Sequence, residues 1–169
     1  MAELDVWAPR YADLSFGDSV AFHGTTRAAE VRTLGPGHTA EDVAVALSGD
    51  GVAFIGDVGF FGTQPFLSDC DLDGYRRQLR GFLEADFPVL VPGHGPVGGR
   101  TDVERELGYM DAMEDLIGKV VARGGSLDEA KAISLPTPFD GWLVGGMNRF
   151  TANLEFMFRH LGGHDAGVS

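Results

Sequence analysis

Short clusters of glycine and proline constrain this chain more than any other feature of its sequence. Its 169 residues include 25 glycines, more than the roughly 7% that is usual in proteins. The glycines gather in groups such as Gly35-Pro36-Gly37 and Pro92-Gly93-His94-Gly95. Groups of this kind mark sharply bent loops rather than flexible linkers. We therefore expect a folded chain of short elements joined by tightly shaped loops.

Length and composition favour one folded domain over residues 1–169. Globular domains mostly run about 100 to 200 residues, and 44% hydrophobic residues supply enough apolar material for a core. No apolar run has the length of a transmembrane helix, and the first residues lack the features of a secretion signal. The only cysteine, Cys70, permits no intrachain disulfide. These features predict a cytoplasmic protein without a membrane partner.

The charge balance argues against nucleic acid as a partner. Thirteen Lys and Arg against 25 Asp and Glu give a formal net charge of −12. This charge repels a phosphate backbone and tolerates bound cations. Its commonest consequence is solubility, so it says little about the chemistry of the chain.

The first part of the chain predicts two hairpins. Ser19–Phe22 and Ala28–Leu34 alternate loosely on either side of a turn. Asp42–Leu47 and Val52–Ile55 flank Asp50-Gly51, which is a strong hairpin signal. A loop over Asp57–Asp69 is expected to follow them.

The second part of the chain predicts mostly helices. Apolar residues at helical spacing, capping boxes and glycine stops indicate the elements: a helix that begins after Asp69 or Asp71 and runs to Leu83, a buried strand over Pro88–Val91, a long helix from Thr101 to Gly124, a short helix opened by Ser126–Glu129, and a terminal helix from Phe150 to Leu161. This order predicts an α/β protein with a layered mixed sheet and helices on one face.

Three polar residues lie where predicted strands meet glycine-rich loops. They are His38 in Gly35–Asp42, Asp57 after Ile55-Gly56, and His94 in Pro92–Gly95. Imidazole and carboxylate are standard ligands of zinc, iron and manganese. Each residue alone fits a loop histidine or a turn-capping aspartate, but together the three predict a metal site.

Taken in order, these loops resemble the second half of the metallo-β-lactamase fold hydrolases. The matching features are Gly35–Thr39, the strand–turn–strand, Gly56-Asp57, a helix and Pro92–Gly95, and the likeness covers roughly residues 14 to 160. It is closest to the branch that includes glyoxalase II-like hydrolases. The segment around Trp142 and Asn153 also resembles the family's C-terminal element. The resemblance implies one half of a four-layer αββα sandwich.

The same resemblance implies roles for the three residues. His38 would bind the first metal ion, Asp57 would bridge two ions, and His94 would bind the second. The family's His-x-His-x-Asp-His segment supplies further ligands and a proton-handling acid, but here only His23 precedes His38. The expected cofactor is therefore a divalent metal, zinc first and iron or manganese as alternatives, at weak or partial occupancy. No catalytic residue is assigned.

Two interpretations of function remain open. The first is a metal-dependent hydrolase with an incomplete metal site, completed by a homodimer or by a complementary N-terminal half, acting on a small-molecule substrate. The second is a truncated, non-catalytic remnant that serves as a binding or structural module. An unrelated α/β module is a more distant third. In the half-sandwich, the sheet face that normally meets the other half is expected to be apolar, which favours self-association.

Other residues are weaker candidates for a functional site. His160 and His164 are separated by Gly162-Gly163, which is expected to end the helix between them. Cys70 has no neighbouring histidine and is expected to be a packing residue. Phe60-Phe61 fits either a substrate-facing wall or the core. The glycines of 97–100 lack the Gly-Lys-Ser/Thr ending of a phosphate-binding loop.

Overall fold

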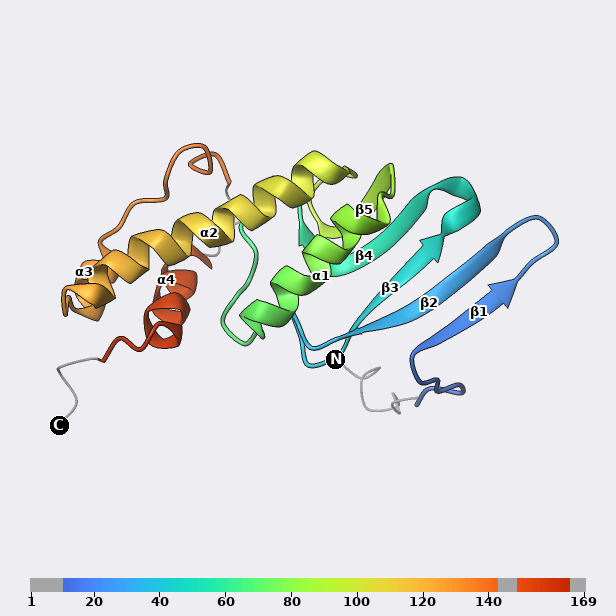
Figure 1. The fold of residues 1–169 in the computed structure, drawn as a ribbon, viewed down its shortest axis with the longest axis horizontal. Coiled ribbons are helices and arrows are strands. Elements are labelled where there is room, and N and C mark those ends of the chain that lie inside the picture. Colours follow the sequence, from blue (N-terminus) through green and yellow to red (C-terminus); the bar gives the residue numbers. More distant parts are fainter. Residues whose placement is uncertain (1–10, 143–148, 165–169) are drawn as a thin grey trace, which may run out of the picture.

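The computed structural model describes residues 11–142 and 149–164. This part of the chain contains five strands and four α-helices, which are labelled in Figure 1. The elements are β1 (Ser19–His23), β2 (Ala28–Gly35), β3 (Asp42–Leu47), the 3₁₀ turn η2 (Ser48–Asp50), β4 (Val52–Phe60), α1 (Leu72–Ala85), β5 (Val89–His94), α2 (Arg100–Ala122), α3 (Leu127–Lys131) and α4 (Arg149–His160). No helix in the described ranges is long and apolar enough to cross a bilayer.

The strands form one mixed sheet in the order β1-β2-β3-β4-β5. Neighbours from β1 to β4 are antiparallel, which confirms both predicted hairpins. β4 and β5 are parallel, and α1 supplies the crossover that a parallel pair requires. The predicted α/β fold is therefore confirmed, with a sheet that is antiparallel except at one edge.

Two strands continue further than the sequence predicts. β4 reaches Phe60 instead of ending at Ile55, and β5 reaches His94 instead of ending at Val91. The predicted loop therefore begins at Phe61 and not at Asp57, so the prediction was wrong for residues 57–60. Gly56 adopts a positive φ of 53°, and the pairing of β4 with β5 shifts register on both sides of it. Such irregularities let a strand bend and resume its pairing, so Asp57 lies within β4.

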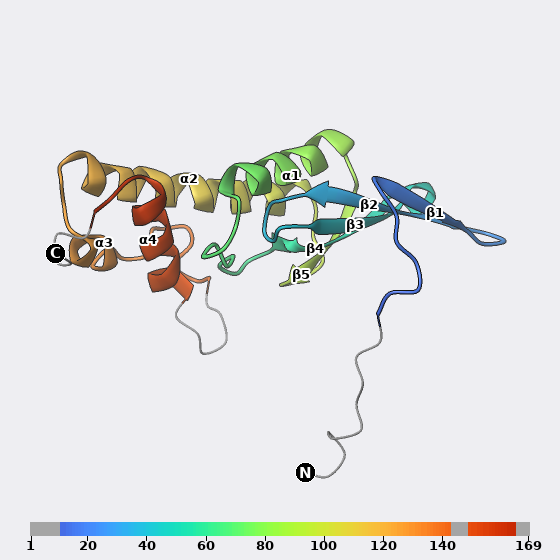
Figure 2. The same ribbon diagram turned by 90° about the horizontal axis from the view of Figure 1, so that it is seen from below.

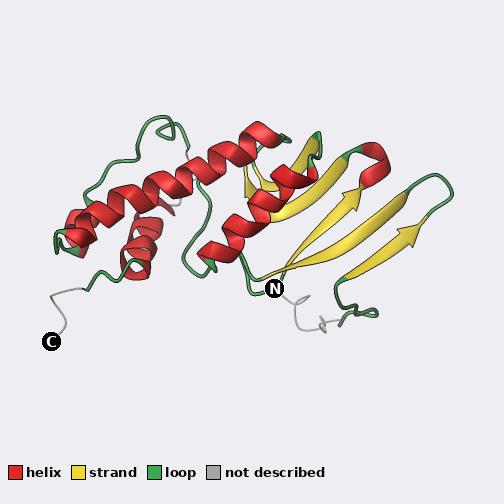
Figure 3. Cartoon of the chain, viewed as in Figure 1, coloured by secondary structure: helices red, strands yellow, loops and turns green. Residues whose placement is uncertain are grey.

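α1 and α2 cover one face of the sheet. Figure 2, seen from below, places α1 and α2 on the same side of the strands, and Figure 3 shows the strands side by side with α3 and α4 beyond one end of the sheet. On the covered face, Ala53 and Ile55 are almost completely buried. Their neighbour Phe54 points to the opposite face and is 44% exposed, as the alternation of strand side chains requires.

The opposite face carries a continuous apolar row that crosses all five strands. Its members pair directly from strand to strand: Val20, Val31, Val45, Phe54 and Val91. We call the sheet face that carries this row the open face. The sequence-based expectation that this face is apolar is confirmed.

Capping side chains fix where the helices begin. The Asp71 carboxylate accepts a hydrogen bond from Gly74 N at 3.0 Å, and the Ser126 hydroxyl accepts one from Glu129 N at 3.2 Å, as predicted. The N-cap of α2 is Gly99, two residues before the predicted N-cap Thr101. Asp102 accepts from Gly99 N at 3.1 Å, so the helix begins at Arg100 rather than after Thr101.

One carboxyl group lies in the centre of the core. Glu106 of α2 is fully buried, and its Oε1 is hydrogen-bonded to the Tyr75 hydroxyl at 2.7 Å. Its Oε2 accepts from Phe60 N at 2.9 Å. Burial raises the pKa of Glu106 to about 8, although both hydrogen bonds oppose the rise. The side chain is therefore mainly the neutral acid at pH 7, and it ties α2 to α1 and β4.

The buried acid predicts a pH dependence of stability. As pH rises from about 5 to about 8, the unfolded chain releases the Glu106 proton and the folded chain keeps it, so the free energy of unfolding should fall by up to about 1.4 kcal/mol per pH unit from this group. Glu106→Gln has no titrating proton at this position, so the pH dependence of its free energy of unfolding should lack this contribution. Urea unfolding of both proteins across this range measures the difference. Parallel curves for the two proteins would contradict the prediction.

Candidate metal site

Parallel pairing brings two of the three predicted ligands to one edge of the sheet. Phe60 of β4 pairs with His94 of β5, and Gly56 pairs with Pro92. Asp57 and His94 therefore lie near each other, because the carboxyl ends of parallel strands meet at the same edge. His38 reaches this edge from the loop between β2 and β3. All three line one open cavity of about 550 Å³, together with Phe60, Phe66, Arg149 and Ala152.

Asp57 and His94 are adjacent and both remain accessible. His94 Nε2 lies 3.5 Å from Asp57 Oδ1, and their side chains are 42% and 50% exposed. The glycine at position 93 makes this approach possible, because a Cβ there would overlap the Asp57 carboxylate. Both side chains therefore keep donor atoms available to a ligand.

His38 is the most unusual residue of the site. Its ring nitrogens Nδ1 and Nε2 are both buried and have no hydrogen-bond partner among the described residues. Burial lowers the pKa of the imidazole, and the negative charge of Asp57 opposes that change. Buried polar atoms without partners are rare in folded proteins. A neutral imidazole with unused nitrogens has the chemistry of a metal ligand.

The His38 loop is held by hydrogen bonds from two sides. The Asp42 carboxylate accepts from His38 N at 2.7 Å, and from Thr39 N at 3.0 Å and Thr39 Oγ1 at 2.7 Å. From α1, Gln78 Nε2 donates to Gly35 O at 2.9 Å. The backbone next to His38 is thus fixed by β3 and α1. The sequence analysis did not assign Asp42 a role, although its place four residues after His38 was a usable signal.

Phe60 separates the two imidazoles. Its ring stacks on His94 with centroids 4.5 Å apart, and lies 5.3 Å from His38 at a tilt of 45°. Phe60 and Phe61 are both 1% exposed, which places both in the core. Phe60 also lines the cavity, so the wall and core interpretations both hold for this residue.

Arg149 adds a positive charge to the cavity. Its guanidinium carbon lies 5.6 Å from the centre of the Phe60 ring, and its Nη1 donates weakly to Gln64 O at 3.5 Å. Arg149 begins α4, far along the chain from His38 and Asp57. No local sequence pattern links it to the site, and the sequence analysis missed it together with Phe66.

The donor set fits a divalent ion but does not form a finished cluster. Two imidazoles and a carboxylate are suitable ligands for zinc, iron or manganese. Yet within residues 11–142 and 149–164, no group of three or more His, Cys, Asp or Glu side chains is arranged to hold a metal. In this part of the chain, His38, Asp57 and His94 are therefore not arranged as the ligands of one ion.

The weaker candidates lie outside this site. Cys70 is half-buried, and burial raises the pKa of its thiol to about 12, which keeps it protonated at pH 7. α4 ends at His160, so His160 and His164 do not share a helix face. These findings agree with the packing role predicted for Cys70 and with the predicted end of the helix.

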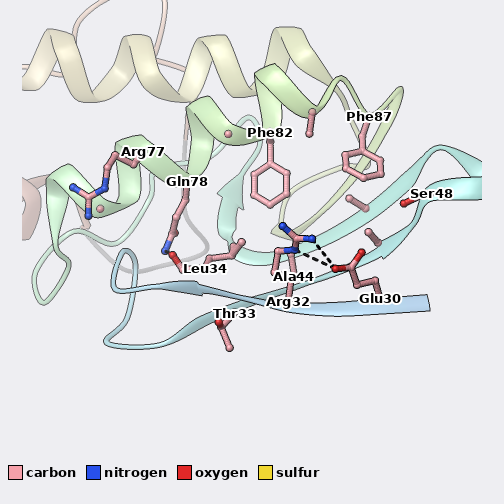
Figure 4. A pocket seen from close by; sticks show the side chains of 15 residues that line it. Glu30, Arg32, Thr33, Leu34, Ala44, Ser48, Arg77, Gln78, Phe82 and Phe87 are labelled. Carbon is pink, nitrogen blue, oxygen red and sulfur yellow. Dashed lines mark hydrogen bonds and ion pairs between the residues drawn. The ribbon is translucent and has the colours of Figure 1, made fainter. Parts of the chain in front are cut away.

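A second cavity, also of about 550 Å³, lies between α1 and the strands β2 and β3 (Figure 4). Ala44 and Phe82 line it, and the Glu30–Arg32 ion pair, 2.7 Å long, lies along one side. None of the three candidate ligands contributes to this cavity. It is therefore separate from the candidate metal site.

Comparison with known structures agrees with this fold. A metallo-beta-lactamase from Pontibacter korlensis is 26% identical and has a TM-score of 0.51, over 57% of this chain and 47% of its own. A stereoselective inverting sec-alkylsulfatase from Pseudomonas sp. has a TM-score of 0.65 at 15% identity, over 90% of this chain and 27% of its own. The chain thus spans less than half the length of either structure.

Comparison of sequences gives the family directly. No curated protein matches the chain. The sequence model of the metallo-beta-lactamase superfamily, however, matches residues 8–94. This range is about half of the chain, and it contains His38, Asp57 and His94. The chain therefore belongs to the metallo-beta-lactamase superfamily.

Proposed function

We propose that this chain supplies one half of the metal site of a metal-dependent hydrolase, with His38, Asp57 and His94 as ligands. The observation that carries the proposal is the His38 imidazole. Both ring nitrogens are buried without a hydrogen-bond partner among the described residues, in the cavity that Asp57 and His94 also line. A bound ion explains such a group. Membership of the superfamily supports the same proposal.

The donors favour a divalent ion, zinc first, with iron or manganese as alternatives. The family resemblance implies that Asp57 is the donor that two ions would share, and its carboxylate lies 3.5 Å from His94 Nε2. His38 would then hold one ion and His94 the other. A bound ion would supply Lewis-acid chemistry by polarising the substrate and lowering the pKa of water towards about 7.

The cavity suits a small-molecule substrate. Phe60 and Phe66 give it apolar walls, and Arg149 adds a positive charge beside them. The apolar walls would exclude water from one side of the substrate, and the guanidinium would orient a polar or anionic group. His38, Asp57 and His94 lie in the same cavity, so a substrate bound there would reach the metal.

Three donors are too few for two ions, so we propose that the remaining ligands come from protein outside these 169 residues. The 169 residues contain no His-x-His-x-Asp-His segment. In the fold that the chain resembles, this segment belongs to the half that covers the open face. We propose that the open face is covered either by a second copy of this chain or by a complementary N-terminal half.

The size of the open face decides how strongly two copies would associate. Five strands at about 4.8 Å spacing and about 17 Å length present roughly 400 Å². A patch of this size marks an interaction surface. Two copies would bury roughly 800 Å² in total, less than the ~1,200 Å² of most stable interfaces. Self-association through this face is therefore expected to be weak and to depend on concentration.

One observation favours a second function, a non-catalytic binding or structural module. In the described part of the chain, no three metal-ligating side chains converge on one point. On this alternative the chain keeps the fold and weak metal affinity but turns over no substrate. Activity after addition of a complementary half separates the two functions.

The proposed ligands predict metal content. Zinc should bind the wild-type chain weakly, and both His94→Ala and Asp57→Ala should abolish this binding, because each removes a proposed ligand. Zinc content after dialysis and titration calorimetry measure the effect. His23→Ala is the matched control, since His23 lies on β1 and lines a different cavity. Equal zinc content in wild type and His94→Ala would overturn the proposed site.

The open face predicts concentration-dependent association. Sedimentation equilibrium at micromolar concentration should show mass above the 18.0 kDa of one chain. Phe54→Glu should shift the population to monomer, because it places a charge within the apolar row. Val97→Glu, at an exposed apolar residue outside the strands, should leave association unchanged. A wild-type monomer that binds no apolar dye would exclude the homodimer.

The incomplete donor set predicts low activity for the chain by itself. With zinc added, the monomer should show little or no turnover of β-lactam, glutathione thioester or phosphodiester substrates, because ligands and the proton-handling acid are lacking. Turnover should appear when a complementary half is supplied. A zinc-dependent rate of the monomer that Asp57→Ala abolishes would contradict this prediction and would show that three ligands are enough.

A further inference from the structure

We propose that Glu106 and Tyr75 are positioning residues for the candidate metal site. Through hydrogen bonds to the backbone of β4 they fix Asp57, and they fix the Phe60 ring that separates His38 from His94. The inference deepens the proposed function and rests on it for the identity of the ligands. Neither residue lines the candidate cavity, so both would act through β4 and not on the substrate.

The need for such residues arises from the irregular end of β4. Gly56 pairs with Pro92 and Phe60 pairs with His94, so β4 uses two more residues than β5 over the same span. Extra residues in one strand leave backbone groups without partners in the ladder. Buried backbone groups nevertheless require partners. Asp57 lies in this irregular segment, so whatever completes its hydrogen bonds also sets its position.

Glu106 and Tyr75 supply partners in this segment. Phe60 N donates to Glu106 Oε2 at 2.9 Å, and the Tyr75 hydroxyl lies 3.4 Å from Asp57 O and 2.7 Å from Glu106 Oε1. Tyr75 comes from α1 and Glu106 from α2. Both side chains are fully buried. The two covering helices are thus connected to the segment that carries a proposed ligand.

The connection reaches both histidines through Phe60. The Phe60 ring is stacked on His94 and inclined against His38, and the Tyr75 ring meets His38 edge-on at 5.8 Å. A shift of the Phe60 backbone would therefore move the surface on which both imidazoles rest. The Tyr75 ring also contacts His38 directly, and the Tyr75 hydroxyl is hydrogen-bonded to Glu106.

A purely structural role does not require a carboxyl group here. An apolar side chain such as leucine would fill a similar volume without the cost of burying an acid. It would, however, leave Phe60 N without its acceptor. Glutamine keeps that acceptor and matches the neutral acid in shape. The comparison of these two replacements therefore separates positioning from packing.

The experiment uses four variants of the full chain. Glu106→Gln keeps the acceptor, Glu106→Leu and Tyr75→Phe remove one hydrogen bond or more, and Ile117→Ala is the control. Ile117 is fully buried on the same helix as Glu106 and contacts none of the proposed ligands through a described hydrogen bond or ring contact. It should therefore lower stability without disturbing the site.

Two measurements are made on each variant. The first is the set of histidine ring signals in the NMR spectrum of the metal-free protein, which depend on ring stacking with Phe60. The second is the zinc dissociation constant by competition with a chelator. Glu106→Leu should shift the His38 and His94 signals and weaken zinc binding about 10- to 100-fold. Tyr75→Phe should change both in the same direction, and Glu106→Gln should stay within about threefold of wild type.

The outcomes separate this inference from the proposed function. Unchanged histidine signals and zinc affinity in Glu106→Leu would overturn the inference, and so would equal changes in Ile117→Ala. If Glu106→Leu fails to fold, Tyr75→Phe is compared with Ile117→Ala instead. Unchanged histidine signals and zinc affinity in Tyr75→Phe, or equal changes in both variants, would then overturn the inference. If wild type binds no zinc, the proposed function fails. The histidine signals then still decide whether Glu106 and Tyr75 position the two rings.

Discussion

The parallel pairing of β4 with β5 is the constraint on which the rest of the structure depends. It places the ends of two strands at one edge, which brings Asp57 close to His94. The crossover that makes the pair parallel is α1, and α1 also holds the His38 loop through Gln78. One topological choice thus brings all three proposed ligands to a single cavity.

Two buried carboxyl groups accept hydrogen bonds from the backbone close to the proposed ligands. Asp42 satisfies backbone groups in the His38 loop, and Glu106 satisfies one at the irregular end of β4. In both places the chain leaves regular hydrogen bonding close to a proposed ligand. An acceptor from another element replaces the missing partner. The geometry of the site therefore depends on residues that would never touch a metal ion.

The sequence was sufficient for the elements but not for their irregular ends. Asp50-Gly51 predicts the second hairpin, and Asp71 and Ser126 predict helix starts, because turn and capping preferences act over a few residues. The extension of β4 beyond Gly56 was missed, because it depends on pairing with a strand far along the chain. The three proposed ligands were selected from local loops. Glu106 and Arg149 reach the site only through tertiary packing, which no local pattern records.

The strand pairs differ greatly in the number of residues in the loop that each pairing closes. Val52 of β4 lies 5 positions after Leu47, its partner on β3, and 37 positions before Val89, its partner on β5. Closing the second loop therefore costs about 2 kcal/mol more in chain entropy. That cost has to be offset by the docking of α1 on the sheet. The pairing of β4 with β5 therefore depends more on the packing of α1 than the antiparallel pairs do. A change that loosens α1 would weaken the edge of the sheet that carries Asp57 and His94.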